Sequence, residues 1–359
     1  MSLLTSLATF SATLFCLTAT IAEAADAPEP NDPLLQTVAT RTLPGAGHSW
    51  GFAALAPDRA QLFIARRENG LTVFDVTKQK ALKTLNNSTG ANGIAIVPPF
   101  NRAYVANMDG SIGIVALDSL KVLKRLPVDS GNLNNVVYDA THRRVIFTSG
   151  RRGDHSTLYW LDPATDRLTG LRDVRAQKLD APIMLADGTL VLPFRDEDQV
   201  ALLSGDGFEQ QRLLTFPGCS KPSAVAADEA SKVLFVACRG GKPTLIVADL
   251  SSGKTLTQLP IDRAVNALAY DARSAQLLIP SGADASLAVV RKDANGGYRL
   301  IGAVGTRPWA HNMVLDAARG QVYLFAMGFT QPAPTPDVSK PDPQFHADTF
   351  SVLTLKLLH

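Results

Sequence analysis

Histidine side chains are the first candidates for chemistry in this sequence. The chain has six histidines, and His48, His311 and His346 occur in segments that the repeat described below brings to one end of the molecule. Neutral imidazoles grouped with a carboxylate, such as that of Asp348, suit Cu or Zn. The three residues therefore form a candidate transition-metal site. The alternative is that they are separate loop histidines bonded to backbone, because no pair has a spacing that by itself enforces a ligand geometry.

Basic residues recur at equivalent places along the chain. Each set follows the second apolar segment of a repeat unit: Arg66 and Arg67, Arg151 and Arg152, Arg195, and Arg239. Lys221 and Arg307 stand near the start of later units. Guanidinium groups that converge on one opening would bind a carboxylate, a phosphate or a single-stranded nucleic acid. The alternative is a loop surface that neutralises itself, since acids stand beside these residues: Glu68, Asp154, Asp196, Glu197 and Asp198.

Cys219 and Cys238 are the only cysteines outside the apolar N-terminal segment, which holds Cys16. A two-residue turn near Asp228-Glu229 would place 219 opposite 238 on neighbouring antiparallel strands, so the spacing suits a disulfide. Closing a loop of roughly 20 residues would stabilise the chain by about 3 kcal/mol in the chain-entropy model. Two reduced, buried thiols are the alternative. The spacing matches neither a C-x-x-C redox motif nor a haem attachment motif.

The segment Gly47-His48-Ser49-Trp50-Gly51 matches the G-x-S-x-G pattern of the nucleophile elbow of α/β-hydrolases. That motif requires a buried strand before the serine and a helix after it. Here Thr42-Leu43-Pro44-Gly45 precedes the serine, and Pro57 would interrupt a following helix. We therefore expect a loop that enters a strand, with Trp50 packed at its inner end and no nucleophilic role for Ser49.

A repeat of about 40 residues must position these side chains. Ala54–Asp58, Leu62–Ala65, Leu71–Asp75 and Ala81–Leu85 are short apolar segments separated by turn residues, and the pattern returns along the chain. Four strands in a repeat of this length predict one propeller blade. Seven such units begin near Trp50, Ala91, Leu133, Asp180, Lys221, Val265 and Trp309. The expected fold is an all-β, seven-bladed β-propeller.

The last unit supplies only three strands, and Gln36–Leu43 is an alternating strand without a blade. Pairing it as the outer strand of the last blade would close the ring and remove an open edge. A Pro-rich insertion, Gly328–Thr349, interrupts that blade and is expected to be structureless and to cover part of the channel mouth. Asparagines near the innermost strands are expected to tie the inner loops together: Asn92, Asn134, Asn135, Asn266 and Asn312.

The N-terminus has a different composition from the repeats. Leu3–Ile21 is apolar and uncharged, and it is followed by Ala22-Glu23-Ala24, a small-x-small cleavage pattern. Residues 1–24 therefore read as a signal peptide, 25–33 as a flexible linker and 34–359 as the propeller. We expect a periplasmic or secreted protein without stable membrane insertion. The net charge of +2 is too small to indicate a polyanionic partner by itself.

The segment Ala103-Tyr104-Val105-Ala106-Asn107 resembles the Y-V-T-N motif, and Leu71–Val76 and Phe350–Leu353 resemble its valine-rich strand. The whole chain after the N-terminal segment is similar to YVTN-repeat, YncE-like seven-bladed propellers of bacterial envelopes. The resemblance implies an exported propeller, for most members of which no reaction is assigned. It also implies a structural cysteine pair where Cys219 and Cys238 stand.

These observations favour a monomeric, non-catalytic scaffold that binds a small molecule or a protein on the face bearing His48 and His311. The candidate residues of that face are His48, Trp50, Arg66, Asn92, Arg151, Arg195, Arg239, Trp309, His311 and His346. One alternative is a metal-assisted hydrolase, lactonase or lyase on the same face. Another is anion or single-stranded nucleic-acid binding through the arginine-rich loops.

Overall fold

The computed structural model describes residues 34–151 and 153–358. The strands form seven four-stranded antiparallel sheets, of which six are built from four consecutive strands. Blade 1 comprises β2 (Ala53–Ala56), β3 (Gln61–Ala65), β4 (Leu71–Asp75) and β5 (Lys80–Thr84). Blade 2 comprises β6 (Ala91–Val97), β7 (Arg102–Asn107), β8 (Ser111–Ala116) and β9 (Lys121–Pro127). Blade 3 comprises β10 (Leu133–Asp139), β11 (Arg144–Ser149), β12 (Ser156–Asp162) and β13 (Arg167–Val174).

The remaining blades follow the same order. Blade 4 comprises β14 (Ile183–Met184), β15 (Leu190–Phe194), β16 (Gln199–Ser204) and β17 (Gln210–Thr215). Blade 5 comprises β18 (Pro222–Asp228), β19 (Val233–Cys238), β20 (Thr244–Asp249) and β21 (Thr255–Pro260). Blade 6 comprises β22 (Ala269–Asp271), β23 (Gln276–Ser281), β24 (Ser286–Lys292) and β25 (Tyr298–Gly305). Three single-turn 3₁₀ helices follow β2, β6 and β15: η1 (Pro57–Arg59), η2 (Pro98–Phe100) and η3 (Arg195–Glu197).

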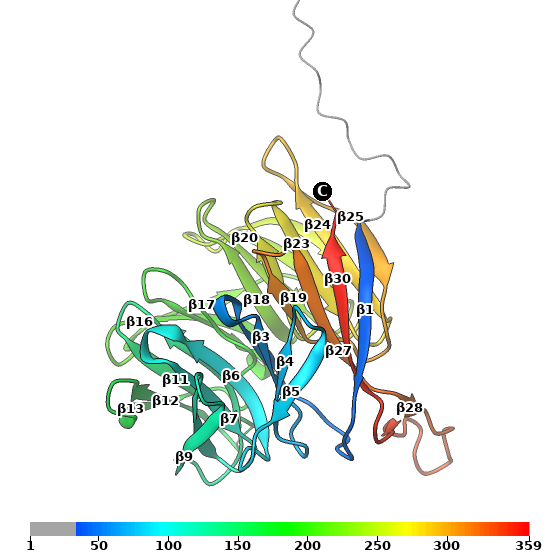
Figure 1. The fold of residues 1–359 in the computed structure, drawn as a ribbon. Helices are drawn as coiled ribbons and strands as arrows, with labels where there is room; N and C mark the ends of the chain where they lie inside the picture. The colour runs from blue at the N-terminus through cyan, green and yellow to red at the C-terminus, as the bar shows by residue number, and fades with distance from the viewer. Residues whose placement is uncertain (1–33, 152, 359) are drawn as a thin grey trace, which may run out of the picture. The chain divides into compact units, whose positions relative to one another are not determined.

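Blade 7 joins the two ends of the described chain. Its strands are β26 (Met313–Asp316), β27 (Gln321–Ala326), β30 (Phe350–Leu357) and, outermost, β1 (Leu35–Leu43). The register runs from Leu35 opposite Leu357 to Leu43 opposite Phe350, and Figure 1 shows β1 beside β30. The predicted all-β, seven-bladed propeller and its closure by the N-terminal strand are therefore confirmed.

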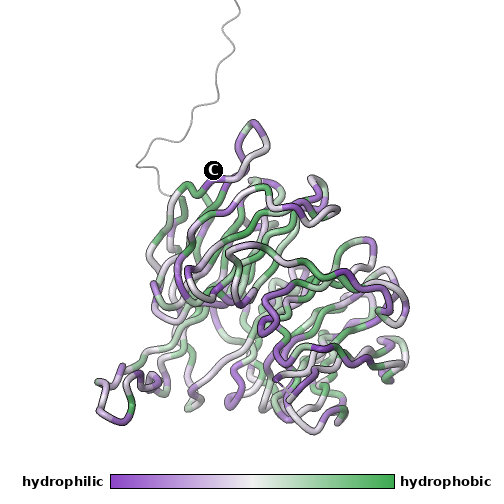
Figure 2. Tube along the Cα trace, turned by 180° about the vertical axis from the view of Figure 1, so that it is seen from behind, coloured by the Kyte–Doolittle hydropathy of each residue, from purple (hydrophilic) through white to green (hydrophobic). Residues whose placement is uncertain are grey.

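The burial of the strands follows their place in the blade. β7 and β8 are buried almost along their whole length, because both faces of the sheet pack against neighbouring blades, whereas the outer β9 is mostly exposed. Figure 2 shows the apolar segments within the blades and polar residues at the turns. Between blades 7 and 1, Leu43, Trp50 and Phe350 belong to one buried cluster, so Trp50 packs inward as expected.

The outermost strands manage their exposed edges with β-bulges. The register shifts at the outer strand in six of the seven blades, all except blade 4. In β1 the inserted residue is Val38, and in β9 it is Leu123. A bulge twists and interrupts an edge, which hinders pairing with another chain.

Polar side chains near the innermost strands tie successive blades together, as expected for the asparagines. Asn92 donates to the carbonyl oxygens of Leu133 and Asn134, and Asn134 donates to Leu179 O. Ser223 does the same to Val265 O. Asn266 donates to Asn312 Oδ1, and Asn312 donates to Gly51 O across the ring closure. These contacts fix the inner loops that surround the channel mouth.

Cys219 and Cys238 form a disulfide with a Cα–Cα distance of 5.2 Å. The bridge was predicted, but the predicted register was wrong. The turn is longer than two residues, because Asp228 pairs with Val233, so Cys238 lies opposite Pro222 and not opposite residue 219. Cys219 reaches Cys238 from the loop that precedes β18, where its amide donates to Phe216 O.

The blade 7 insertion was expected to be structureless, but part of it is ordered as strands. It contains a small hairpin of β28 (Phe329–Thr330) and β29 (Gln344–Phe345). The loop between these strands is mostly exposed, and Figure 1 shows it projecting away from the blades at the lower right. The expected signal peptide, 1–24, and linker, 25–33, lie outside the described residues. Within the described part of the chain, no helix is long and apolar enough to cross a membrane.

Candidate ligand-binding site

Two sets of loops share one face of the propeller, which we call the entry face. One set leads into the innermost strand of each blade, and the other joins its second strand to its third. Because successive strands of a blade are antiparallel, both sets lie at the same end of the sheets. Loops held by a rigid scaffold are common places for binding groups. The candidate residues of the sequence all belong to these loops or to the strand ends beside them.

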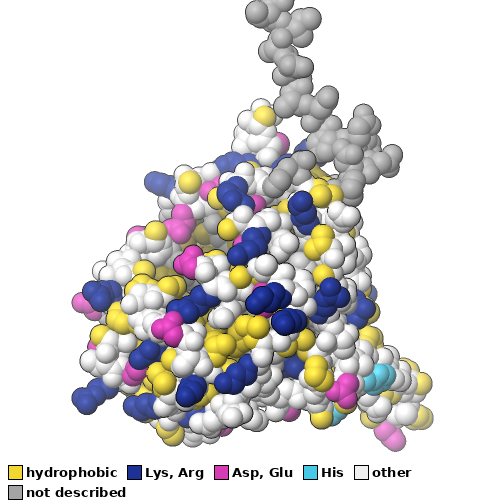
Figure 3. Space-filling view, viewed as in Figure 1, with side chains coloured by type: hydrophobic (Ala, Val, Ile, Leu, Met, Phe, Trp, Pro, Cys, Tyr) yellow, Lys and Arg dark blue, Asp and Glu magenta, His cyan; other side chains and the backbone are white. Residues whose placement is uncertain are grey.

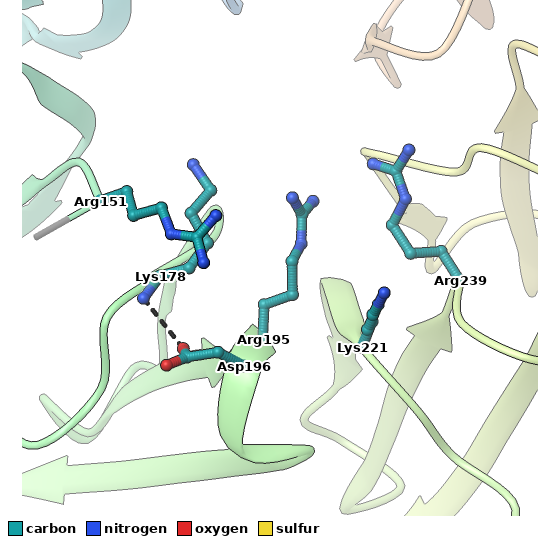
Figure 4. A pocket seen from close by; sticks show the side chains of 6 residues that line it. All are labelled: Arg151, Lys178, Arg195, Asp196, Lys221 and Arg239. Carbon is teal, nitrogen blue, oxygen red and sulfur yellow. Dashed lines mark hydrogen bonds between the residues drawn. The ribbon is translucent and has the colours of Figure 1, made fainter. Parts of the chain in front are cut away.

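A cavity of about 450 Å³ opens on the entry face between blades 3, 4 and 5. We call it the cationic mouth. Its lining residues are Arg151, Lys178, Arg195, Asp196, Lys221 and Arg239. Figure 4 shows Arg195 between Arg151 and Arg239, with the charged ends of these side chains turned toward one open space. The structure thus brings three of the predicted arginines together and adds Lys178, which the sequence did not single out.

The acids beside the arginines keep their charge, and Asp196 itself lines the cationic mouth, but the hydrogen bonds of Asp196 and Asp198 go to backbone amides and not to the guanidinium groups. Asp196 accepts hydrogen bonds from the backbone amides of Gln177 and Lys178, at 2.8 and 2.9 Å. Asp198 accepts one from the amide of Lys221 at 2.7 Å. Backbone N–H groups of neighbouring loops therefore occupy these carboxylates. Their role is to hold the loops that carry the basic side chains.

Two other acids of that set have partners outside the mouth. Both oxygens of the Glu68 carboxylate accept from Ser49, one from its hydroxyl at 2.6 Å and one from its amide at 3.2 Å. Asp154 bonds to Nδ1 of His155 at 2.7 Å. Ser49 thus lies in a loop before β2, as expected, and not between a buried strand and a helix.

Arg195 is the cation of the mouth that has an acidic partner. Its Nε forms an ion pair with Oδ2 of Asp180, a carboxylate that is only 4% exposed. Burial raises the pKa of Asp180, and the nearby charges of Arg195, Lys178 and Arg239 oppose that rise. This ion pair fixes the Arg195 side chain, which Figure 4 shows extended between Arg151 and Arg239.

The other four cations, Arg151, Lys178, Lys221 and Arg239, have no side-chain ion pair within residues 34–151 and 153–358. Lys178 and Arg239 are also partly buried. Burial lowers the pKa of Arg239, and the charge of Arg195 lowers it further. Burial likewise lowers the pKa of Lys178. Like charges held together out of water favour an anion that would neutralise them.

A second cavity, of about 180 Å³, lies on the entry face between blades 7 and 1. We call it the aromatic pocket. Its lining residues are His48, Ser49, Trp50, Arg67, Trp309, His311 and Phe345. Phe345 comes from the blade 7 insertion and meets Trp50 and Trp309 edge to face, with ring centroids 5.3 and 5.7 Å apart. The insertion therefore contributes to this pocket through its β29 end, while its Pro-rich loop extends elsewhere.

The three histidines of the predicted metal site do not converge on one point. His311 stacks on Trp50, with ring centroids 5.8 Å apart, and burial lowers the pKa of His311 to about 4. Nδ1 of His48 bonds to Phe345 O, and Nε2 of His346 bonds to the Thr330 hydroxyl. No group of three His, Cys, Asp or Glu side chains in the described residues could hold a metal ion. The ligand set predicted from the loops thus does not form there.

Arg66 and Asn92 line neither cavity and have structural surroundings. Arg66 is 2% exposed, donates to Pro44 O, and lies over the Phe350 ring at 4.8 Å. Asn92 belongs to the ring of blade-to-blade hydrogen bonds and accepts from Nε of Arg67. Arg66 and Asn92 thus serve the packing of the blades beside the pockets. Arg307, which follows β25 of blade 6, likewise donates to the hydroxyl of Ser351 in β30 of blade 7.

Comparison with known proteins supports the fold. No protein-family model and no curated protein sequence matches the chain. The solved structure of U3-55K is similar with a TM-score of 0.69 at 10% identity, covering 88% of this chain and 98% of that one. The RRP9 WD40 repeats give 0.70 at 10% identity, covering 90% and 100%. A chain of a mitotic checkpoint complex gives 0.70 at 12% identity, covering 96% and 99%. At such identities the likeness shows a WD40-like propeller fold and no more.

Proposed function

We propose that this protein is an exported, non-catalytic propeller that binds an anionic group of a small-molecule or protein ligand in the cationic mouth. The observation that carries the proposal is the set of four basic side chains around one cavity without ion-pair partners in the described chain. A carboxylate or phosphate placed among them would gain several charge-assisted hydrogen bonds at once. It would also relieve the repulsion between Arg195 and Arg239.

The site is built in advance of any ligand. Asp196 and Asp198 hold the backbone of the loops, and Asp180 holds Arg195. The loops are therefore already ordered before a ligand binds, so binding carries less entropy cost and the affinity is higher. Figure 3 shows basic and acidic side chains interspersed on the outer surface of the blades in view, without one dominant basic area. Anion binding is therefore supported by the basic side chains that converge on the cationic mouth, and not by the net charge of the protein.

The resemblance to YVTN-repeat propellers and the apolar N-terminal segment support the exported part of the proposal. An oxidising compartment would also suit the Cys219–Cys238 disulfide. The propeller neighbours among solved structures are compatible with a protein ligand, since WD40 repeats and a checkpoint complex are among them. A partner protein would present its anionic group as an acidic segment.

The test is calorimetric titration of the full chain with inorganic pyrophosphate and with an oligoglutamate peptide at several salt concentrations. Arg239→Gln and Arg151→Gln should each weaken binding about ten- to hundredfold, because a hydrogen bond to a charged group contributes about 1.5–3 kcal/mol. Arg299→Gln is the matched control, because it removes the same charge from the exposed outer strand β25. It should change the affinity less than twofold.

Unchanged affinity in both mouth variants, or an equal loss in Arg299→Gln, would contradict the proposal. Oligothymidine serves as a further probe for the nucleic-acid alternative. If it binds at physiological salt far more tightly than pyrophosphate or oligoglutamate, and loses affinity in the same variants, the anionic ligand is a nucleic acid. Binding of oligoglutamate as the tightest of the three would favour an acidic protein segment.

A further inference from the structure

The aromatic pocket has the walls of a site for a flat ring. Trp50, Trp309 and Phe345 approach from three different segments, the loops entering blades 1 and 7 and the insertion of blade 7. Phe345 lies edge-on to both indoles, and His311 is stacked on Trp50. Such walls offer both faces and edges of aromatic rings, which an aromatic ligand can meet in stacked or edge-to-face geometry. The volume of about 180 Å³ suits one ring.

The backbone of Trp309 is held in an uncommon conformation at this pocket. Its φ is +67°, in the left-handed region that bulky residues rarely adopt. The strain is sustained because the amide of Trp309 donates to Gly282 O at 2.7 Å. At Gly282 an added Cβ would lie 2.9 Å from the His311 Cβ, so glycine permits this close approach. Strained residues that the surroundings hold in place are typical of ligand-binding sites.

The polar groups of the pocket select the charge of its occupant. Nε of Arg67 is used by Asn92, whereas its two terminal nitrogens have no hydrogen-bond partner within the described residues. The buried Nε1 of Trp50 likewise has no partner there. Glu68, whose charge acts on Arg67, has both carboxylate oxygens bonded to Ser49. The terminal nitrogens of Arg67 are thus available to an acceptor, and a guanidinium fork matches a carboxylate.

We propose that the aromatic pocket binds a single-ring aromatic carboxylate, with its ring among Trp50, Trp309 and Phe345 and its carboxylate on Arg67. A cationic ring is disfavoured by Arg67, and a neutral ring would leave the guanidinium unpaired. The aromatic pocket lies between blades 7 and 1 and shares no lining residue with the cationic mouth. This proposal can therefore be tested separately from the proposed function.

The test titrates the full chain with benzoate and follows intrinsic fluorescence, because two of the three tryptophans line the pocket. Fluorobenzoate followed by fluorine NMR gives a second readout. A dissociation constant of about 1 mM or tighter is expected for so small a ligand. Benzylamine and benzyl alcohol should bind at least tenfold more weakly. Arg67→Met should weaken benzoate binding at least tenfold, and Arg67→Lys should restore part of the loss.

Arg299→Gln is the control, since it removes a charge from the exposed outer strand β25 and from neither cavity, and it should change the benzoate affinity reported by Trp50 and Trp309 less than twofold. Gly282→Ala, which displaces Trp309 or His311 without altering a lining residue, should weaken benzoate binding and leave pyrophosphate binding unchanged. Equal binding of benzoate and benzylamine, or full affinity in Arg67→Met, would overturn the proposal. Thymidine that binds more tightly than benzoate would assign the pocket to a nucleobase and overturn it as well.

Discussion

Closure of the ring by β1 can be tested with two substitutions on one strand. Leu43 is 3% exposed and packs in the cluster that contains Trp50 and Phe350, whereas Val38 is 47% exposed at the bulge of the same strand. A buried Leu→Ala substitution costs about 2–5 kcal/mol through lost burial and the cavity that remains. We expect about 2–3 kcal/mol for Leu43→Ala, because Leu43 is the last residue of the strand. Val38→Ala should stay within about 0.5 kcal/mol.

Leu35→Ala extends the test to the other end of β1. Leu35 is 5% exposed and packs in a different cluster, with Leu324 and Leu355. The two leucines are eight residues apart along an extended strand, roughly 26 Å, so their effects should add within about 0.5 kcal/mol. The assay is urea unfolding followed by circular dichroism, with the midpoints compared at constant slope. If Val38→Ala destabilises the protein as much as Leu43→Ala does, β1 does not close the ring through its buried face.

Three further predictions concern the disulfide, His311 and Asp180. Cys219→Ser should lower the free energy of unfolding by about 3 kcal/mol, and denatured wild-type protein should show no free thiol at these positions. The pKa of His311 is depressed from 6.5 to about 4, so the unfolded chain binds its proton more readily. The free energy of unfolding should therefore rise as the pH increases from about 4 to 6.5. His311→Gln should remove at most about 3 kcal/mol of that rise. The measured loss should be smaller than this limit, because solvent reaches part of the His311 ring. Asp180→Asn should lower stability, because it leaves Arg195 partly buried without its ionic partner, and it should weaken pyrophosphate binding, because Arg195 is no longer held in place before the ligand arrives; tighter binding would contradict this.

The architecture could be predicted from the sequence because each blade repeats the same pattern of four short apolar segments. Strands whose pattern is strong, such as β3 and β4, were found within a residue or two. The closing strand was also found, since Gln36–Leu43 alternates and has no other partner. The cysteine register was missed because turn length cannot be counted from composition. A four-residue turn at 229–232 shifts every opposing pair.

The binding face was predicted only in part, because side-chain partners depend on neighbouring loops. The arginines after the second strands were recognisable, but the hydrogen-bond partners of the adjacent acids were not. Nothing in the sequence shows that Asp196 and Asp198 bond to the backbone amides of residues 177, 178 and 221. Lys178 was missed for a related reason, since the innermost strand of blade 4 is only two residues long and its entry has no clear pattern.

Blade 4 differs from blades 2, 3, 5 and 6 where the ring of inner hydrogen bonds reaches it. The residue that follows the first strand-pairing position is Asn92 in blade 2, Asn134 in blade 3, Ser223 in blade 5 and Asn266 in blade 6, but Asp180 in blade 4. An ionised carboxylate has no proton to donate to a carbonyl of the next blade. Asp180 pairs with Arg195 of its own blade instead. The ring thus loses a tie between blades 4 and 5 at the place where the cationic mouth opens. A neutral amide would have served the packing of the blades, so the charge at this position is explained by what it does for Arg195.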